Sequence, residues 1–185
     1  KIYKLFNQNK SKKMLLKLIT EYPECYIGHK MLAEIYVKEG GRRKAIDEYV
    51  KAIDINKKDY DSYYEIAFLL NELDKKDESI QMLNTLVNKK PDYYKASELL
   101  GSLFCEKEMF KEAINVYQNA MQYDPNNYEI YYNLGIAYTR LNDFQKAQEY
   151  YKMAAEINAE LYLAMYNLGM ISLMFASSIS PNIKD

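Results

Sequence analysis

The feature that most constrains the fold is an internal repeat with a period of 34 residues. Glycine recurs at that spacing in the second half of the chain, and alanine and tyrosine keep a fixed phase with it. Because several residue types share one phase, the repetition predicts a stack of similar supersecondary units. The recurring residues are Gly101, Gly135 and Gly169; Ala113 and Ala147; Tyr117 and Tyr151; Ala120 and Ala154; Pro91 and Pro125; and, 68 residues earlier, Pro23, Ala45, Tyr49 and Ala52.

One unit is clearest between residues 128 and 160. Apolar side chains fall there at helical spacings in two segments, which predicts two amphipathic helices joined by a polar turn at 141–144. Gly135 lies within the first segment, where glycine costs about 1 kcal/mol relative to alanine, so a neighbouring helix is expected to approach closely. The apolar stripes are Tyr131, Leu134 and Tyr138, then Ala147, Tyr151 and Ala154.

These residues resemble the tetratricopeptide repeat (TPR) family. Its degenerate pattern has a bulky residue at position 4, Leu-Gly at 7 and 8, an aromatic at 11, Ala at 20, an aromatic at 24, Ala at 27 and Pro at 32. The unit at 60–93 departs most, with Ser79, Leu83 and Leu86 in its second half. The resemblance covers full units at 26–59, 60–93, 94–127 and 128–161, the end of a truncated unit at 1–25 and a first helix at 162–175, followed by a tail at 176–185.

The resemblance implies an all-α fold, a right-handed α-solenoid of stacked antiparallel helix pairs that forms a single array over residues 1–185. A single hairpin cannot bury its apolar face, so neighbouring hairpins must stack. Asp59, Asp92 and Asn127 are candidate N-caps. First helices are expected at about 26–39, 60–73, 94–107, 128–141 and 162–175, with second helices between them.

Composition argues against several other classes of function. A net charge of −1 provides no field that would attract nucleic acid or an acidic membrane. Two cysteines, Cys25 and Cys105, are too few for a disulfide framework, which fits a cytoplasmic protein. His29 is the only histidine and occupies a packing position, and no phosphate loop or nucleophile motif is present. We therefore expect no catalysis, cofactor or metal.

The binding surface is predicted from the repeat phase. In the family the first helices line a concave groove, into which positions 2, 5, 9, 12 and 13 point, and an Asn at position 6 grips a peptide backbone. A rigid tyrosine there offers a large contact area at low entropic cost. The alternative is that the tyrosines only buttress neighbouring helices. The candidate residues for binding a protein or peptide are Tyr64, Phe68, Lys95, Glu98, Glu129, Tyr132, Asn133, Ile136, Arg140, Tyr166, Asn167 and Met170.

Two features bear on the ligand of that groove. Its middle is acidic, so a peptide with hydrophobic anchors and some basic residues would match it. The clamp that some family members use for C-terminal carboxylates is not expected, because three of its five positions carry other residues. These positions hold Lys30, Glu34, Glu65, Lys95 and Leu99, and Glu34, Glu65 and Leu99 depart from the clamp.

The stretch 161–179 has no charged residue, but it keeps the repeat phase and contains polar residues, so it reads as a stacked first helix rather than a membrane span. Its outer face would need a further repeat, a partner or a second copy of the chain to cover it. Self-association through Leu163, Met170 and Met174 is therefore an alternative function. RNA binding is a third hypothesis, and the strict 34-residue period and the low net charge argue against it.

Overall fold

The computed structural model describes the backbone of residues 2–179 and the side chains of residues 9–173. All regular structure within that range is helical. In chain order the helices are α1 (Ile2–Glu21), α2 (Tyr26–Lys38), α3 (Arg42–Ile55), α4 (Tyr60–Glu72), α5 (Lys76–Lys89), α6 (Tyr94–Glu106), α7 (Phe110–Met121), α8 (Tyr128–Arg140), α9 (Phe144–Ile157) and α10 (Tyr162–Ile179).

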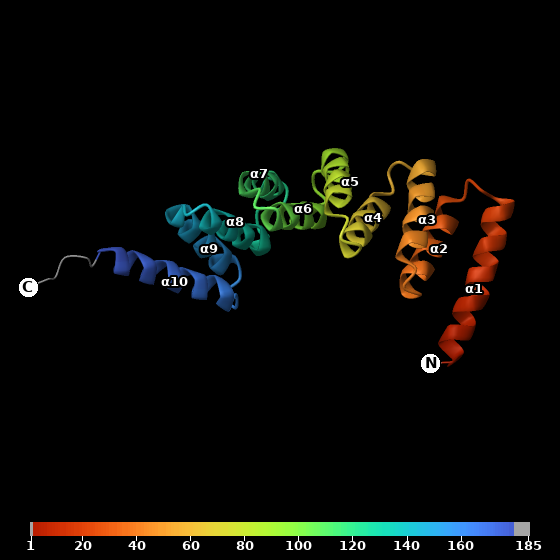
Figure 1. Cartoon of the computed structure of the whole chain (residues 1–185), viewed down its shortest axis with the longest axis horizontal. Coiled ribbons are helices and arrows are strands. Elements are labelled where there is room, and N and C mark those ends of the chain that lie inside the picture. The colour runs from red at the N-terminus through yellow and green to blue at the C-terminus, as the bar shows by residue number, and fades with distance from the viewer. Residues whose placement is uncertain (1, 180–185) are drawn as a thin grey trace, which may run out of the picture. The chain divides into compact units, whose positions relative to one another are not determined.

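The helices form two compact units, unit 1 at residues 1–90 and unit 2 at residues 91–185. Within each unit, every helix packs against the next one along the chain. Figure 1 shows α2 and α3, α4 and α5, α6 and α7, and α8 and α9 as successive hairpins. The predicted all-α fold of stacked antiparallel helix pairs is confirmed, and the single continuous array remains a prediction.

The helix boundaries follow the repeat phase closely. Each of the first helices α2, α4, α6 and α8 begins at the predicted residue and ends one residue early. The prediction that α10 ends at 175 is wrong, because the helix continues to Ile179. The first helix breaker after 175 is Pro181. The rest of the predicted tail, 180–185, lies outside the described residues.

The predicted N-caps are partly right. Asn127 caps α8, and its side chain accepts a hydrogen bond from the Glu129 amide at 3.0 Å. Asp59 holds the cap position of α4, but its carboxylate instead accepts a bond from the Ser62 hydroxyl at 2.7 Å. Asp92 is not a cap, because α6 begins one residue later and Tyr93 precedes it. Two of the three predicted positions are therefore confirmed.

The turn inside each hairpin has the same backbone geometry in all four full repeats. One residue per turn has a positive φ, and the amide that follows it donates to a carbonyl five residues earlier, at 2.8–3.0 Å. This is the left-handed C-cap that reverses the chain after a helix. The residues with positive φ are Gly40 (+78°), Asp74 (+58°), Glu108 (+58°) and Asn142 (+60°).

Glycine and tyrosine pack against each other where the two helices of a hairpin meet. A Cβ placed on Gly135 would lie 2.6 Å from the Tyr151 ring, and one on Gly101 would lie 2.3 Å from Tyr117. The expected close approach at Gly135 is thus confirmed. Gly169 of α10 has no neighbouring atom within 4 Å of its Cβ position. The described part of the chain supplies no second helix to fill that slot.

Among the described residues, no helix is long and apolar enough to cross a membrane.

Candidate functional site

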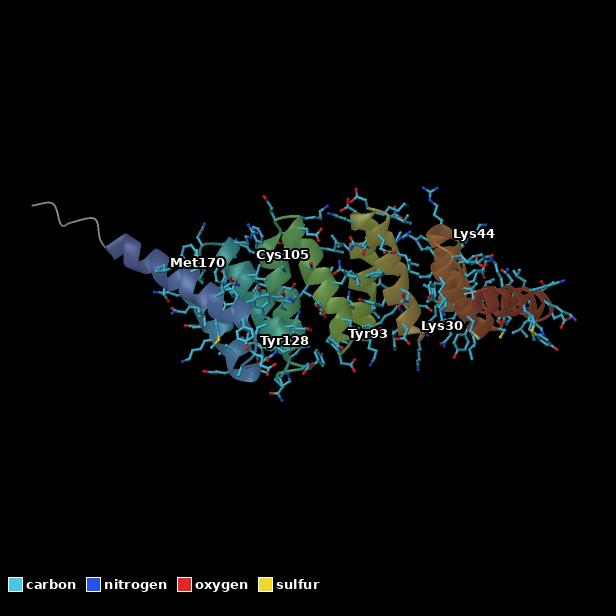
Figure 2. All side chains as sticks on the ribbon, turned by 90° about the horizontal axis from the view of Figure 1, so that it is seen from below. Lys30, Lys44, Tyr93, Cys105, Tyr128 and Met170 are labelled. Atoms are coloured by element: carbon cyan, nitrogen blue, oxygen red, sulfur yellow. The ribbon has the colours of Figure 1, made fainter. Side chains whose placement is uncertain are left out.

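Most of the predicted binding residues lie in unit 2, on the first helices α6, α8 and α10. We call their shared surface the unit-2 face. Figure 2 shows Cys105, near the end of α6, and Tyr128, at the start of α8, at opposite edges of this unit. The face therefore has one edge at the N-terminal ends of the first helices and another at their C-terminal ends. It consists of Lys95, Glu98, Ser102 and Cys105; Glu129, Tyr132, Asn133, Ile136 and Arg140; and Tyr166, Asn167 and Met170.

Carboxylates gather near the N-terminal edge, between α6 and α8. Glu98 is half-buried, and this burial together with the nearby charge of Glu129 raises the pKa of Glu98. Lys95 acts in the opposite direction without cancelling the shift. The Tyr128 hydroxyl donates to Glu129 Oε1 at 3.3 Å. This edge of the face is therefore acidic and partly shielded from water.

A pocket of about 350 Å³ lies near the C-terminal edge of the same two helices. Burial raises the pKa of the Cys105 thiol, and the charge of Arg140 opposes that shift, so the two side chains lie close together. The pocket combines an apolar wall with one cationic group, Arg140, and two carboxylates, Glu106 and Glu108. It is lined by Ser102, Cys105, Glu106, Glu108, Phe110, Ile136 and Arg140.

The tyrosines that pack under the glycines also reach this face. Tyr151 comes from the second helix α9, and its hydroxyl is hydrogen-bonded to Thr139 Oγ1 at 3.3 Å and to the Asn167 side chain. Asn167 is thus held within the protein. Asn133, at the same repeat position, makes no side-chain hydrogen bond with any described residue. Of the two predicted backbone-gripping amides, Asn133 alone is available.

Tyr132 has a packing role as well as a surface position. It is half-buried, and its ring centroid lies 5.7 Å from that of Tyr151 at 51°. The Tyr132 ring therefore packs against Tyr151 of α9 as well as lying near the surface. Tyr166 and Met170 of α10 are more open, with 64% and 43% of their surface exposed.

Unit 1 carries only Tyr64 and Phe68 of the predicted residues, both on α4. Their rings stack with centroids 6.4 Å apart, and Phe68 is exposed. The charges beside them are paired: Lys30 of α2 contacts Asp59 at 3.0 Å and Asp61 at 3.3 Å. Figure 2 labels Lys30 at one edge of unit 1 and Lys44 at the other. Because Asp59 and Asp61 are paired with Lys30, this part of unit 1 offers less free charge to a ligand than the unit-2 face does.

His29 has the packing role expected from its repeat position. It is buried, with Nδ1 hydrogen-bonded to Glu48 Oε2 at 2.6 Å, and Nε2 donates to the Pro23 carbonyl at 3.1 Å. The described residues contain no group of three His, Cys, Asp or Glu side chains arranged to hold a metal.

The repeat phase did not identify the hydrogen bonds of the Tyr151 hydroxyl beneath this face, because Tyr151 falls in the apolar stripe of its helix. The usable signal was the combination of Gly at position 8 with Tyr at position 24. Glycine lets the ring pass beneath the first helix, and the phenol is long enough for its hydroxyl to reach the other side.

Alpha10 exposes a long apolar surface. Tyr162, Leu163, Met165 and Leu173 each have more than half of their surface exposed. Exposed apolar area of this extent marks a contact site more often than a free surface. The side chain of Met174, which was predicted to take part, lies outside the described residues.

Several solved structures share the fold. YrrB, described as a TPR protein with an unusual peptide-binding site, has a TM-score of 0.72 at 19% identity over 89% of this chain and 85% of that one. MamA has a TM-score of 0.74 at 20% identity, over 85% and 92% of the two chains. A tetratricopeptide repeat protein from Parabacteroides merdae has a TM-score of 0.73 at 14% identity, over 94% and 70%. At these identities the likeness shows the fold alone.

Comparison with curated protein sequences gave no significant match. Three family models match the sequence: one described as TPR repeat at residues 101–142, and two described as tetratricopeptide repeat at 128–161 and 61–93. The match at 128–161 has the same bounds as the repeat deduced from the sequence, and the match at 61–93 begins one residue inside its unit. The chain belongs to the tetratricopeptide repeat family.

Proposed function

We propose that the chain is a non-catalytic scaffold for protein–protein interaction, which binds a segment of a partner protein in the groove formed by its first helices. The observation that carries the proposal is the unit-2 face, where Asn133 and Ile136 of α8 offer an unbonded amide and a half-buried apolar side chain, and Tyr166 of α10 offers an exposed ring. Rigid aromatic anchors with a nearby hydrogen-bonding group suit recognition of a peptide. The description of YrrB, a protein of the same fold, mentions a peptide-binding site.

The test uses peptides selected from a random ten-residue display library on the immobilised chain. The groove variant combines Asn133→Ala with Tyr166→Ala, because neither side chain has a hydrogen bond to another described residue. The matched control combines Asn119→Ala with Tyr123→Ala, which removes the same two chemical groups from exposed positions off the first helices.

We expect the selected peptides to bind the groove variant at least tenfold more weakly, about 1.4 kcal/mol, and the control variant unchanged. Far-UV circular dichroism should give the same helicity for all three proteins. Equal affinity for the groove variant and the wild type would place the binding surface elsewhere.

A second candidate function is self-association through α10, supported by its exposed apolar surface and the open slot at Gly169. We propose α1 of a second copy as the helix that covers it. Helix α1 repeats the second-helix pattern of α5 at a distance of 68 residues, and Leu15 is buried like its counterpart Leu83. Leu18, however, is exposed whereas its counterpart Leu86 is fully buried, and Met14 is exposed whereas its counterpart Met82 is half-buried. The matching pairs are Ser11 and Ser79, Met14 and Met82, Leu15 and Leu83, Leu18 and Leu86, and Pro23 and Pro91.

Such a contact is head-to-tail and would join copies into rings or open chains. We expect light scattering to show a mass that rises beyond a dimer with concentration. Met14→Glu on α1 and Met165→Glu on α10 should each give a monomer, and an equimolar mixture of these variants should give a dimer, because one intact face of each kind remains. A monomer at every concentration of the unaltered chain argues against this function.

A further inference from the structure

A cavity of about 440 Å³ lies in unit 1, beside the turn that joins α2 and α3, and we call it the α3 cavity. Figure 2 labels one of its lining residues, Lys44, at an edge of the unit. Three consecutive basic residues at the start of α3 form part of its wall, and the half-buried Tyr36 and Leu73 form an apolar part. The lining residues are Tyr36, Glu39, Gly40, Gly41, Arg42, Arg43, Lys44 and Leu73.

Two carboxylates that meet this basic wall are already neutralised by ion pairs. Glu39 lines the cavity and is paired with Lys12 of α1. Glu72, the last residue of α4, binds the Arg42 guanidinium through both of its oxygens, at 2.8 Å and 3.4 Å. Neither carboxylate is therefore left to balance the two basic residues that follow Arg42.

Arg43 and Lys44 are cations without a carboxylate partner. Both side chains are exposed, and neither forms a hydrogen bond or an ion pair with a described residue. Lys44 Nζ lies 5.8 Å from the centre of the Tyr36 ring, which places the ammonium group beside the apolar part of the wall. Together with Lys12 and Arg42, these residues set four positive groups against two carboxylates, in a chain whose net charge is −1. The α3 cavity therefore carries a local excess of positive charge.

The rest of α3 does not compensate this excess. Its first turn contains no acidic residue, and no side chain caps its N-terminus. The dipole of the helix therefore adds to the positive charge of the side chains. Asp47 lies one turn along α3 from Arg43 but forms no ion pair with it. A hollow lined by charge of one sign concentrates ligands of the opposite sign, so the cavity favours an anion.

We propose that the α3 cavity binds a phosphate monoester. Its volume falls within the range of about 300–1,000 Å³ that holds small organic ligands, so the carrier of the phosphate group fits as well as the group itself. A phosphate monoester is close to a dianion at neutral pH and has three acceptor oxygens, which match two free cations. Arg43 and Lys44 bind these oxygens through charge-assisted hydrogen bonds, and Tyr36 and Leu73 contact the carrier. The site belongs to unit 1, and the inference does not depend on peptide binding by unit 2.

The test titrates the isotope-labelled 185-residue chain with N-acetyl-O-phosphoserine amide and follows backbone amide shifts by NMR. Gly40 and Gly41 line the cavity, and glycine amides resonate in a separate region of the spectrum, so their signals report binding directly. We expect saturable shifts of these two amides, and at least tenfold weaker binding of the unphosphorylated N-acetyl-serine amide. The absence of saturable shifts, or equal binding of the two compounds, would overturn the proposal.

Further ligands identify the source of the phosphate group. The phosphoserine derivative represents a phosphorylated residue of a partner protein, whereas glycerol 1-phosphate carries the same group on a small free molecule. The tighter of these two esters identifies the source, and either order upholds the site. Inorganic phosphate has no carrier to contact the apolar part of the wall, and we expect it to bind at least threefold more weakly than the tighter ester. Equal binding of inorganic phosphate and both esters would refute the assignment of a monoester.

Variants separate the α3 cavity from general surface charge. Arg43→Gln with Lys44→Gln should weaken binding of the tighter ester at least tenfold without loss of helicity, because both side chains are exposed. The matched control, Lys58→Gln with Lys111→Gln, removes the same charge from two exposed positions outside the cavity and should leave binding unchanged. Lys111 holds the same repeat position on α7 as Arg43 holds on α3. Retained binding in the Arg43/Lys44 variant, or an equal loss in the control, would refute the site.

Discussion

At the scale of single residues, the same amino acid has opposite effects at equivalent repeat positions. Gly101 and Gly135 lie against the tyrosine rings of their second helices, whereas Gly169 faces open space. Alanine is the better helix former by about 1 kcal/mol, so a glycine inside a helix lowers stability unless a side chain at that position would collide with a neighbour.

This contrast predicts opposite stability changes for two alanine substitutions. Gly135→Ala places a Cβ 2.6 Å from the Tyr151 ring, and overpacking of this kind costs about 1–3 kcal/mol. Gly169→Ala meets no atom within 4 Å and should stabilise the protein by up to about 1 kcal/mol. Urea unfolding of the two variants measures the sign of each change in the free energy of unfolding. A gain in stability for Gly135→Ala would mean that the Tyr151 ring moves aside at no cost.

At the scale of helices, the sequence predicts the start of each first helix because the 34-residue phase is repeated in several units, each of which constrains the others. It does not predict hydrogen-bond partners, since equivalent positions carry different neighbours. Asn133 and Asn167 share a repeat position, but only Asn167 has a tyrosine hydroxyl to bind. The contact between Tyr132 and Tyr151 could not be predicted for the same reason, because the repeat phase does not give the direction of the Tyr151 ring.

A second feature at the scale of helices is the buried carboxyl group of Glu48, at the junction of α1, α2 and α3. Burial of Glu48 would raise its pKa, but its hydrogen bonds and charge contacts with Lys51 and His29 outweigh burial and lower it. A carboxyl with a lowered pKa in the folded state stabilises the fold above its ordinary pKa near 4.5 and loses that contribution as the pH falls further. The His29–Glu48 pair thus holds α2 against α3 more strongly at neutral than at acidic pH.

We therefore expect Glu48→Gln to destabilise the protein by about 1–3 kcal/mol above pH ~5.5 and by much less near pH ~3. Urea unfolding of the variant and the wild type at both pH values measures the difference between them, which removes the effect of the other carboxyl groups. Asp47→Gln changes an exposed neighbouring carboxyl and is the control. A difference that does not change with pH would assign the stabilisation to shape rather than to charge.

At the scale of the whole molecule, the chain divides into two compact units, and the residues proposed to bind a peptide lie in the second. In a repeat fold each hairpin contacts only its neighbours, so stability is close to a sum of local terms. The net charge of −1 does not reveal the local distribution of charge, because Lys30 is paired with Asp59 and Asp61 in unit 1, whereas Glu98 lies near another carboxylate, Glu129, in unit 2.

A fragment of residues 91–185 should therefore fold and bind without unit 1. It contains α6–α10 with their shared core, and we expect it to keep its helicity and to bind selected peptides within about twofold of the full chain, since no residue of the proposed peptide-binding site comes from unit 1. Circular dichroism and calorimetric titration measure the two properties, and the fragment 1–90 provides the comparison. A folded 91–185 fragment that binds at least tenfold more weakly than the full chain would contradict this prediction.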